Sequence, residues 1–174
     1  MKRIILFGLL LFSLIGLAQE KERELTNFAF LIGDFEFKGK TLKSKTEYNH
    51  YSGIWKSSYI LDNAVIEEDF KIIGENGETT FHGLTLRSFN SKTNEWVMGF
   101  FDALNPKWYP LGQPEFKDGT ISFKGNLPGL QPGQLLQVTF YDIGDNSFKW
   151  KSDISPDNGK TWVYDFTIIE ATRK

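Results

Sequence analysis

The stretch "VIEEDFKIIGENGETTFHGLTLRSF", from Val65 to Phe89, contains two runs of alternating side chains around a short turn. In the first run, residues 65–73, one set of alternate positions is apolar apart from a single glutamate, and the second run, residues 80–89, is rich in threonine, leucine and phenylalanine. A period of two residues indicates β-strands. Between the runs, Asn76-Gly77 favours a tight hairpin turn. This stretch therefore predicts an antiparallel β-hairpin.

Alternation also sorts the side chains of this hairpin into two faces. The more apolar face of the first strand, which we expect to meet the core, has Glu68 in its middle. A two-residue loop at Asn76-Gly77 places Glu68 opposite Thr85 and leaves Arg87 diagonally adjacent on the same face. Buried opposite charges are expected to pair, because either one alone is uncompensated. A loop one residue longer or shorter would bring His82 inward in place of Arg87.

Similar runs fill most of the remaining chain. They are rich in Val, Ile, Phe, Tyr, Trp and Thr, and turn-forming residues separate most of them. The other expected strands are residues 34–42, 45–51, 54–61, 95–102, 120–124, 135–141, 147–154 and 161–171. Because no interval has room for a crossover helix, the strands are expected to be sequential and antiparallel. The pattern predicts an all-β, up-and-down β-barrel of about 8–10 strands, with a two-sheet sandwich as the alternative.

Two segments depart from the strand pattern. The stretch "KERELTNFAFLI", residues 21–32, has apolar side chains three and four positions apart, so it predicts a short helix that ends at Gly33. The stretch "NPKWYPLGQP", residues 105–114, contains three prolines and predicts a loop or an irregular edge. Trp108 and Tyr109 in this segment are expected either to plug one end of the barrel or to form a stacking platform for a ligand.

The first eighteen residues have the features of an export signal. A basic start precedes the uncharged run "IILFGLLLFSLIGLA", and the small residues Gly16 and Ala18 lie three and one positions before a cut ahead of Gln19. We therefore divide the chain into a signal peptide, residues 1–18, and one barrel domain, residues 19–174, with a periplasmic or secreted destination and no membrane anchor after cleavage. An N-terminal anchor that is never cleaved is the alternative.

Composition excludes or disfavours several classes of function. The chain has no cysteine, which excludes acylation as a lipoprotein and leaves the core to hold the domain together without disulfides. Without the signal, 18 basic residues stand against 22 acidic ones, a net charge of −4, and the absence of a basic block disfavours nucleic acid as a partner. His50 and His82 do not have a metal-ligand spacing, so we expect no metal and no cofactor.

Near the C-terminus, "SPDNGKTW" is one copy of a turn motif that sialidases and related propeller proteins carry several times. Asp157 is expected to accept hydrogen bonds from amides of its own turn, Gly159 to adopt a positive φ, and Trp162 to pack at the base of the hairpin. None of these side chains attacks a sugar. We therefore interpret the motif as a structural clasp on a hairpin and not as a glycosidase site.

Several stretches resemble DUF1579, a family of uncharacterised bacterial proteins with small lipocalin-like barrels. The matching stretches are "FAFLIGDFEFKGK", "LDNAVIEEDFKI", "TFHGLTLRSFNSKTNEWVMGFFDAL" and "IIEATRK". The resemblance implies a barrel with an opening helix and no established activity. It also implies that Arg173 packs over Phe35 and closes the bottom of the barrel. Haem-binding barrels of related shape use a histidine near the C-terminus, and the last histidine here is His82, which disfavours haem.

The interior of the barrel is where we expect a function, since small-molecule sites are mostly apolar cavities with a few polar groups. The candidate ligand contacts are Glu68, Arg87, His82, Asp102, Trp108 and Tyr109. Our leading hypothesis is an exported, non-enzymatic barrel that binds a small apolar or amphipathic molecule inside.

Three other interpretations stay open. In the first, the inward pair of Glu68 with Arg87 or His82 has a structural role alone. In the second, the protein is an enzyme with Glu68 as general base and Asp102 or Tyr109 as a further group. The third is a binding or assembly module that works through its surface, which predicts a filled barrel and an exposed apolar patch.

Overall fold

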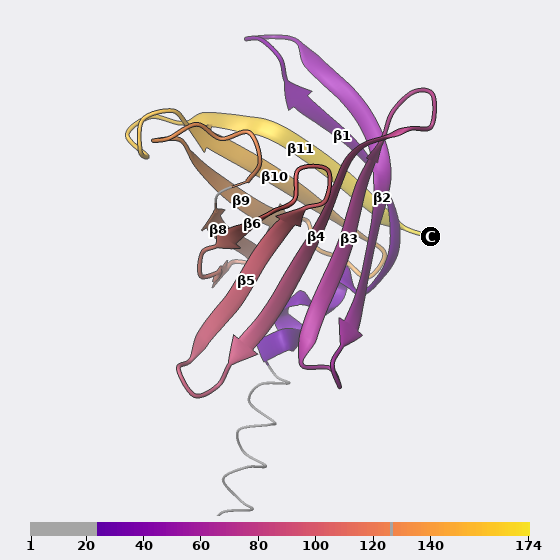
Figure 1. Ribbon diagram of the computed structural model, residues 1–174, viewed down its shortest axis with the longest axis vertical. Helices are drawn as coiled ribbons and strands as arrows, with labels where there is room; N and C mark the ends of the chain where they lie inside the picture. The colour runs from indigo at the N-terminus through magenta and orange to yellow at the C-terminus, as the bar shows by residue number, and fades with distance from the viewer. Residues whose placement is uncertain (1–23, 126) are drawn as a thin grey trace, which may run out of the picture.

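The computed structural model describes residues 24–125 and 127–174, and most of these residues form one antiparallel sheet (Figure 1). A 3-10 helix, η1 (Thr26–Leu31), precedes the sheet. The strands of the described residues are β1 (Gly33–Leu42), β2 (Tyr48–Ile60), β3 (Val65–Ile73), β4 (Thr79–Asn90), β5 (Glu95–Asp102), β6 (Lys107–Leu111), β7 (Glu115–Lys117), β8 (Thr120–Gly125), β9 (Leu135–Tyr141), β10 (Ser147–Ser155) and β11 (Val163–Arg173). The predicted signal peptide, residues 1–18, lies outside the described residues.

The sheet closes into a barrel, as the strand pattern predicted, so the sandwich alternative is wrong. In the described residues the ring runs β6-β5-β4-β3-β2-β1-β11-β10-β9-β8, ten strands, and β7 pairs only with β8. The closing seam is short: Leu111 of β6 pairs with Gly125 of β8, and the Gly112 amide donates to the Lys124 carbonyl at 2.7 Å. Closure removes the open edges that an extended sheet would expose.

The strand pairing of the β3–β4 hairpin is the predicted one. Glu68 pairs with Thr85 and Ile66 pairs with Arg87, so both charged side chains face the interior. Side chains at alternate positions of a strand lie on the same face, and this register therefore leaves His82 on the outside. The first of the two registers that the sequence left open is the correct one.

The turn of this hairpin reaches the predicted register by a different route. The Gly77 amide donates to the Gly74 carbonyl and the Gly74 amide to the Glu78 carbonyl, which makes a three-residue loop with Gly77 at φ 84°. A loop of that length shifts the register by one residue. The irregularity between Ile72 and Ile73 shifts it back, so the two deviations cancel over the rest of the hairpin.

The lower end of the barrel in Figure 1 is closed by η1. Its side chains Phe28 and Leu31 are fully buried, and the Phe28 ring meets Trp96 edge-on at 5.0 Å between ring centroids. The Arg173 guanidinium lies 4.5 Å from the centroid of the Phe35 ring, the contact that the family resemblance implied, and donates to the Ile32 carbonyl at 2.6 Å. Aromatic packing and this arginine therefore make one end of the barrel solid.

Two element predictions need correction. The predicted strands 45–51 and 54–61 are one strand, β2, because Gly53 does not break it. A Cβ on Gly53 would lie 2.0 Å from the Lys71 carbonyl and 2.3 Å from the Phe37 ring, so this glycine leaves room for packing and does not mark a turn. The segment 105–114 is not wholly irregular, since β6 lies within it and pairs with β5.

The predicted opening helix, residues 21–32, is described from residue 24 onward. Residues 24–25 are α-helical and continue directly into the 3-10 segment η1, and Gly33 follows with φ 129°. Short 3-10 segments of this kind are common as connectors between other elements. No helix among residues 24–125 and 127–174 is long and apolar enough to cross a membrane.

Candidate functional site

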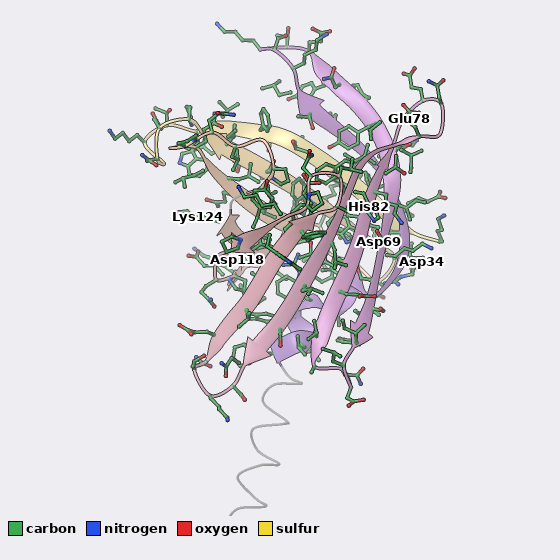
Figure 2. All side chains as sticks on the ribbon, in the orientation of Figure 1. Asp34, Asp69, Glu78, His82, Asp118 and Lys124 are labelled. Atoms are coloured by element: carbon green, nitrogen blue, oxygen red, sulfur yellow. The ribbon has the colours of Figure 1, made fainter. Side chains whose placement is uncertain are left out.

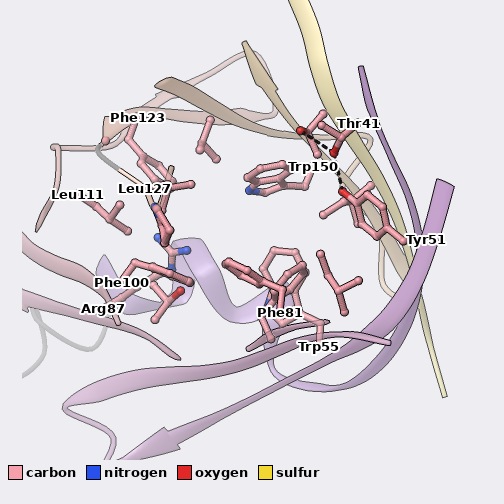
Figure 3. Close-up of a pocket in the computed structure, with 18 residues that line it drawn as sticks. Thr41, Tyr51, Trp55, Phe81, Arg87, Phe100, Leu111, Phe123, Leu127 and Trp150 are labelled. Carbon is pink, nitrogen blue, oxygen red and sulfur yellow. Dashed lines mark hydrogen bonds between the residues drawn. The ribbon is translucent and has the colours of Figure 1, made fainter. Parts of the chain in front are cut away.

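The end of the barrel opposite η1 contains a cavity of about 320 Å³ (Figure 3). Its wall is mainly apolar and comes from strands all around the barrel. The apolar lining residues in the described chain are Tyr51, Trp55, Phe70, Ile72, Phe81, Phe100, Leu111, Phe123, Leu127, Pro128, Val138, Trp150 and Ile169. This volume lies at the lower end of the range for small-molecule sites, and the lining has the expected composition.

A buried ion pair lies beside the cavity floor. Glu68 has 0% of its surface exposed and Arg87 has 2%. Arg87 Nε donates to Glu68 Oε1, and Trp55 Nε1 donates to Glu68 Oε2 at 3.0 Å. The register brings these side chains together from β2, β3 and β4. Arg87 and Trp55 line the cavity, whereas Glu68 lies behind them.

Aromatic rings hold the Arg87 guanidinium in place. Its Cζ atom lies 4.7 Å from the centroid of the Phe28 ring, 5.3 Å from that of Phe123 and 5.7 Å from that of Phe140. Its Nη1 atom donates to the sulfur of Met98 at 3.3 Å. Cation–π contacts with several desolvated rings stabilise a charge that is also paired with a carboxylate. Arg87 is therefore fixed between the η1 plug and the cavity.

Three hydroxyl groups form a second polar cluster in the wall. Thr41 Oγ1 is hydrogen-bonded to the Tyr51 hydroxyl at 3.3 Å and to Thr167 Oγ1 at 3.1 Å. Burial raises the pKa of Tyr51 above its usual 10.0, and the bond with Thr41 offsets this only in part, so the phenol stays neutral. Figure 3 shows this cluster across the cavity from Arg87, with the Trp150 indole nitrogen turned toward the space between them.

His82, the candidate from the alternative register, does not face the cavity. Its Nε2 atom lies 2.8 Å from Asp69 Oδ1 on the outer face of the β3–β4 hairpin, where Figure 2 shows the two side chains together. Lys71 Nζ donates to the other oxygen of Asp69 at 2.8 Å. Burial alone would raise the pKa of Asp69, but the hydrogen bonds with Lys71 and His82 outweigh it and lower the pKa.

Asp102 is buried but is not part of the cavity lining. Its Oδ1 atom accepts hydrogen bonds from the amides of Leu104 at 2.9 Å and Asn105 at 3.1 Å. A carboxylate that accepts amides two and three residues ahead stabilises a turn. Asp102 therefore orders the loop after β5 and does not line the cavity.

Trp108 and Tyr109 also lie away from the cavity lining. Trp108 is 51% exposed and packs beside Phe101, with 5.2 Å between the ring centroids, on the outside of the barrel. Tyr109 is half-buried on β6, and the Lys107 ammonium lies 5.1 Å from the centroid of its ring. Tyr109 pairs with Phe100 and therefore shares its inward face, whereas Trp108 is on the opposite face of β6, and neither residue is part of the cavity lining.

The "SPDNGKTW" segment forms the turn between β10 and β11. Asp157 accepts hydrogen bonds from the Thr161 amide and from the Thr161 hydroxyl, each at 2.8 Å. Gly159 has φ 86°, and a Cβ there would lie 3.9 Å from the Trp162 ring. This geometry is that of a hairpin clasp, and none of these residues lines the cavity.

The sequence interpretation missed Thr41, Tyr51, Thr167 and Trp150 as cavity residues. Each belongs to a predicted strand, and alternation is a signal for facing inward. Alternation does not indicate which strands become neighbours, and Thr41 and Thr167 are 126 residues apart. Trp55 was detectable in the same way, because it shares the inward face of β2 with Gly53.

The described residues contain no group of three or more histidine, cysteine, aspartate or glutamate side chains that could hold a metal ion. No family model matches the chain, so the resemblance to DUF1579 stays a prediction. No curated protein matches it either.

The fold and the site define a class of protein: an antiparallel β-barrel that is solid at one end and hollow at the other. Among solved structures, the chain is similar to the crystal structure of Rv2717c from M. tuberculosis, with a TM-score of 0.62 and 9% sequence identity. The alignment covers 86% of this chain and 96% of that one. At this identity the similarity shows a shared barrel fold and nothing about function.

Proposed function

We propose that the protein binds a small, mainly apolar molecule inside its barrel. The observation that carries the proposal is the cavity of about 320 Å³, lined by aromatic and aliphatic side chains, at one end of a barrel whose other end is packed solid. Leaving apolar surface in contact with water costs roughly 25 cal/mol per Å². An apolar ligand that covers this aromatic lining removes it from water, so binding of such a ligand is favoured.

The position of Glu68 disfavours the enzymatic alternative. A general base needs a path to the substrate and a free lone pair, within hydrogen-bond reach of the proton it removes. Glu68 has no exposed surface, and its two oxygens accept hydrogen bonds from Arg87 and Trp55. The residues named as its partners, Asp102 and Tyr109, do not line the cavity.

The unfilled interior disfavours the alternative of a surface module with a filled barrel. Aromatic side chains fill the half of the barrel around η1, where Phe28, Phe140 and Phe148 have almost no exposed surface. The other half keeps an open space although bulky residues surround it. Protein interiors are normally packed to crystal-like density, so a space of this size has to be maintained by the arrangement of the strands.

Native mass spectrometry of the protein purified from its own host tests the proposal first. An adduct that disappears on denaturation would support a carried ligand, and its mass would indicate the class of molecule. A mass that matches the polypeptide alone in several preparations would contradict tight carriage.

A binding assay with a neutral apolar fluorophore, N-phenyl-1-naphthylamine, tests whether the cavity is the site. Ile72→Trp adds bulk to a half-buried side chain that lines the cavity, and we expect it to weaken binding about tenfold or more. Ile54→Trp is the matched control, because Ile54 lies on the adjacent strand and faces outward. Equal affinities of the two variants would place the binding outside the cavity and contradict the proposal.

We further propose that the protein works after export, with residues 1–18 removed. The support is the basic start, the uncharged apolar run and the small residues before Gln19. Intact-mass measurement of the protein from fractionated cells tests this: a chain that begins at Gln19 in the periplasm or medium supports export. A full-length chain in the cytoplasm would contradict it.

A further inference from the structure

We infer that the ligand of this cavity is an uncharged molecule that carries a hydrogen-bond-accepting oxygen at the end that reaches Arg87. This inference rests on the proposed function and specifies the class of ligand. It follows from the charges around the cavity floor, from the donors that are left without partners, and from the uncharged character of the opposite wall.

The charge at the cavity floor is already balanced. Among the described lining residues, Arg87 is the one charged side chain. Its partner Glu68 is fully buried behind it and holds Nε, so the floor as a whole is neutral. A charge-bearing ligand group at the floor would have no opposite charge left to pair with.

The hydrogen-bonding capacity of Arg87 is not exhausted. A guanidinium has five N–H donors. Nε donates to Glu68 and Nη1 to the Met98 sulfur, and in the described part of the chain Nη2 has no hydrogen-bond partner. Among the described residues, Ser57 Oγ is the fully buried side-chain polar atom without a partner, so an unpaired Nη2 of Arg87 is not sealed off. Because Arg87 lines the cavity and only 2% of the residue is exposed, this donor reaches the space that a ligand would occupy.

A neutral acceptor pairs with these donors without adding charge, whereas a carboxylate adds a negative charge to the cavity floor. A ketone, ester, ether or hydroxyl oxygen would accept from Nη2 and leave the pair with Glu68 balanced. A carboxylate at the same place would bring a second negative charge next to Glu68, with a single guanidinium between them. One of the two carboxylates would then be a buried charge without compensation.

The opposite wall has no charge to offer either. Thr41, Tyr51 and Thr167 present hydroxyl groups that are bonded to one another, and Trp150 presents a neutral N–H. Hydroxyl and indole groups stabilise a second polar atom of a ligand through neutral hydrogen bonds. The site therefore fits a molecule with an apolar body and uncharged oxygen groups.

Three naphthalenes of nearly equal shape test the inference by isothermal titration calorimetry. They are 2-acetylnaphthalene, which has a neutral acceptor, 2-naphthoate, which has a carboxylate, and 2-isopropenylnaphthalene, which has no acceptor. We expect the ketone to bind about tenfold or more tightly than either of the others, because only the ketone pairs with Arg87 without adding charge.

The substitution Glu68→Gln provides a second measurement. It keeps an acceptor for Arg87 Nε and removes the balancing negative charge, so we expect 2-naphthoate to bind about tenfold more tightly than to the native protein. Glu67→Gln is the matched control, since it removes the same charge from the outer face of the same strand and should leave all three affinities unchanged. If Glu68→Gln does not fold, the three probes on the native protein still decide.

The outcomes separate this inference from the proposal on which it rests. Binding of 2-naphthoate to the native protein as tight as that of the ketone would overturn the inference, and so would equal binding of the ketone and the isopropenyl compound. In both cases the cavity would still be a binding site. Binding of every probe that is unaffected by Ile72→Trp would overturn the proposed function, and the inference with it.

Discussion

Glu68 shows how one side chain in the middle of a strand organises its neighbours. It meets Trp55 from β2 and Arg87 from β4, so three consecutive strands are joined at one buried point. The strand period predicted that Glu68 faces inward, because alternation is a local pattern. The choice of Arg87 over His82 as its partner depended on the register, which the turn and the irregularity between Ile72 and Ile73 set together. The contact between Glu68 and Trp55 also lies between neighbours in the chain, because β2 pairs directly with β3. The hairpin sequence did not predict the contact between Arg87 and the ring of Phe28, because Phe28 belongs to η1, far away in the chain.

We predict that Arg87→Met destabilises the fold by about 3–5 kcal/mol, because it leaves Glu68 as a buried charge with only Trp55 as a donor. The double variant Glu68→Gln with Arg87→Met should recover most of this loss, since no buried charge remains. Urea unfolding of the native protein and both variants measures the effect. If Arg87→Met is as stable as the native protein, the buried charge of Glu68 does not need Arg87 for its compensation.

Asp157 allows a prediction about pH. The Thr161 amide, and then the Thr161 hydroxyl, lower the pKa of Asp157 below its usual 3.8. A carboxyl whose pKa is lower in the folded state contributes stability above the unfolded pKa and loses it as the pH falls through the folded pKa. Asp157→Asn should therefore be less stable than the native protein at neutral pH, and the difference should shrink below pH 3.8.

Urea unfolding of both proteins at a series of pH values measures this difference. If it stays constant well below the usual pKa of an aspartate, the charge of Asp157 is not the source of its effect. The clasp would then depend only on the shape of the side chain, which asparagine largely keeps.

At the scale of elements, η1 contributes to the fold mainly through the side chains that it buries in the barrel. It is a 3-10 segment whose N-cap residue, Leu25, makes no side-chain capping hydrogen bond, yet Phe28 and Leu31 have no exposed surface. The sequence predicted an apolar stripe here but not what the stripe would cover. Only the closed barrel provides the ring of side chains into which η1 inserts, because isolated short helices are marginal in water.

We predict that Phe28→Ala destabilises the protein by about 3–5 kcal/mol, the usual loss for a buried phenylalanine. The ring contacts Trp96 and Phe140 and also supports Arg87. Asn27→Ala, in the same segment but exposed, is the control and should change stability by no more than about 0.5 kcal/mol. Thermal and urea unfolding measure both, and similar losses in the two variants would mean that η1 does not act as a plug.

At the scale of the whole molecule, the seam between β6 and β8 decides that the sheet becomes a barrel. It consists of the Leu111–Gly125 pair and the hydrogen bond of the Gly112 amide, whereas neighbouring strands elsewhere pair over longer stretches. The Gln113 side chain extends the edge beyond β6: it accepts from the Trp96 amide and donates to the Trp96 carbonyl, each at 2.8 Å. A side chain thus takes the place of a strand partner where the ladder ends.

We predict that the seam opens before the rest of the barrel. In amide hydrogen exchange measured by mass spectrometry, peptides around Gly112 should exchange at least about tenfold faster than peptides from the centre of β3, because the seam has few hydrogen bonds. Gln113→Leu should speed the exchange of the Trp96 amide further. A bound ligand should slow exchange at the seam, since Leu111 and Gly125 line the cavity. Equal protection of seam and hairpin would contradict the prediction.

The sequence by itself determined the antiparallel all-β class, the inward position of Glu68 and the clasp at Asp157, and it limited the β3–β4 register to two choices, with Arg87 or His82 inward. All of these depend on residues close together in the chain, where the period of two and the turn chemistry act directly. Tertiary structure alone decided that β6 meets β8, that Thr41, Tyr51 and Thr167 share one wall, and that the space beneath them stays open. Strand stagger and the total volume of inward side chains set these features, and no single strand contains that information.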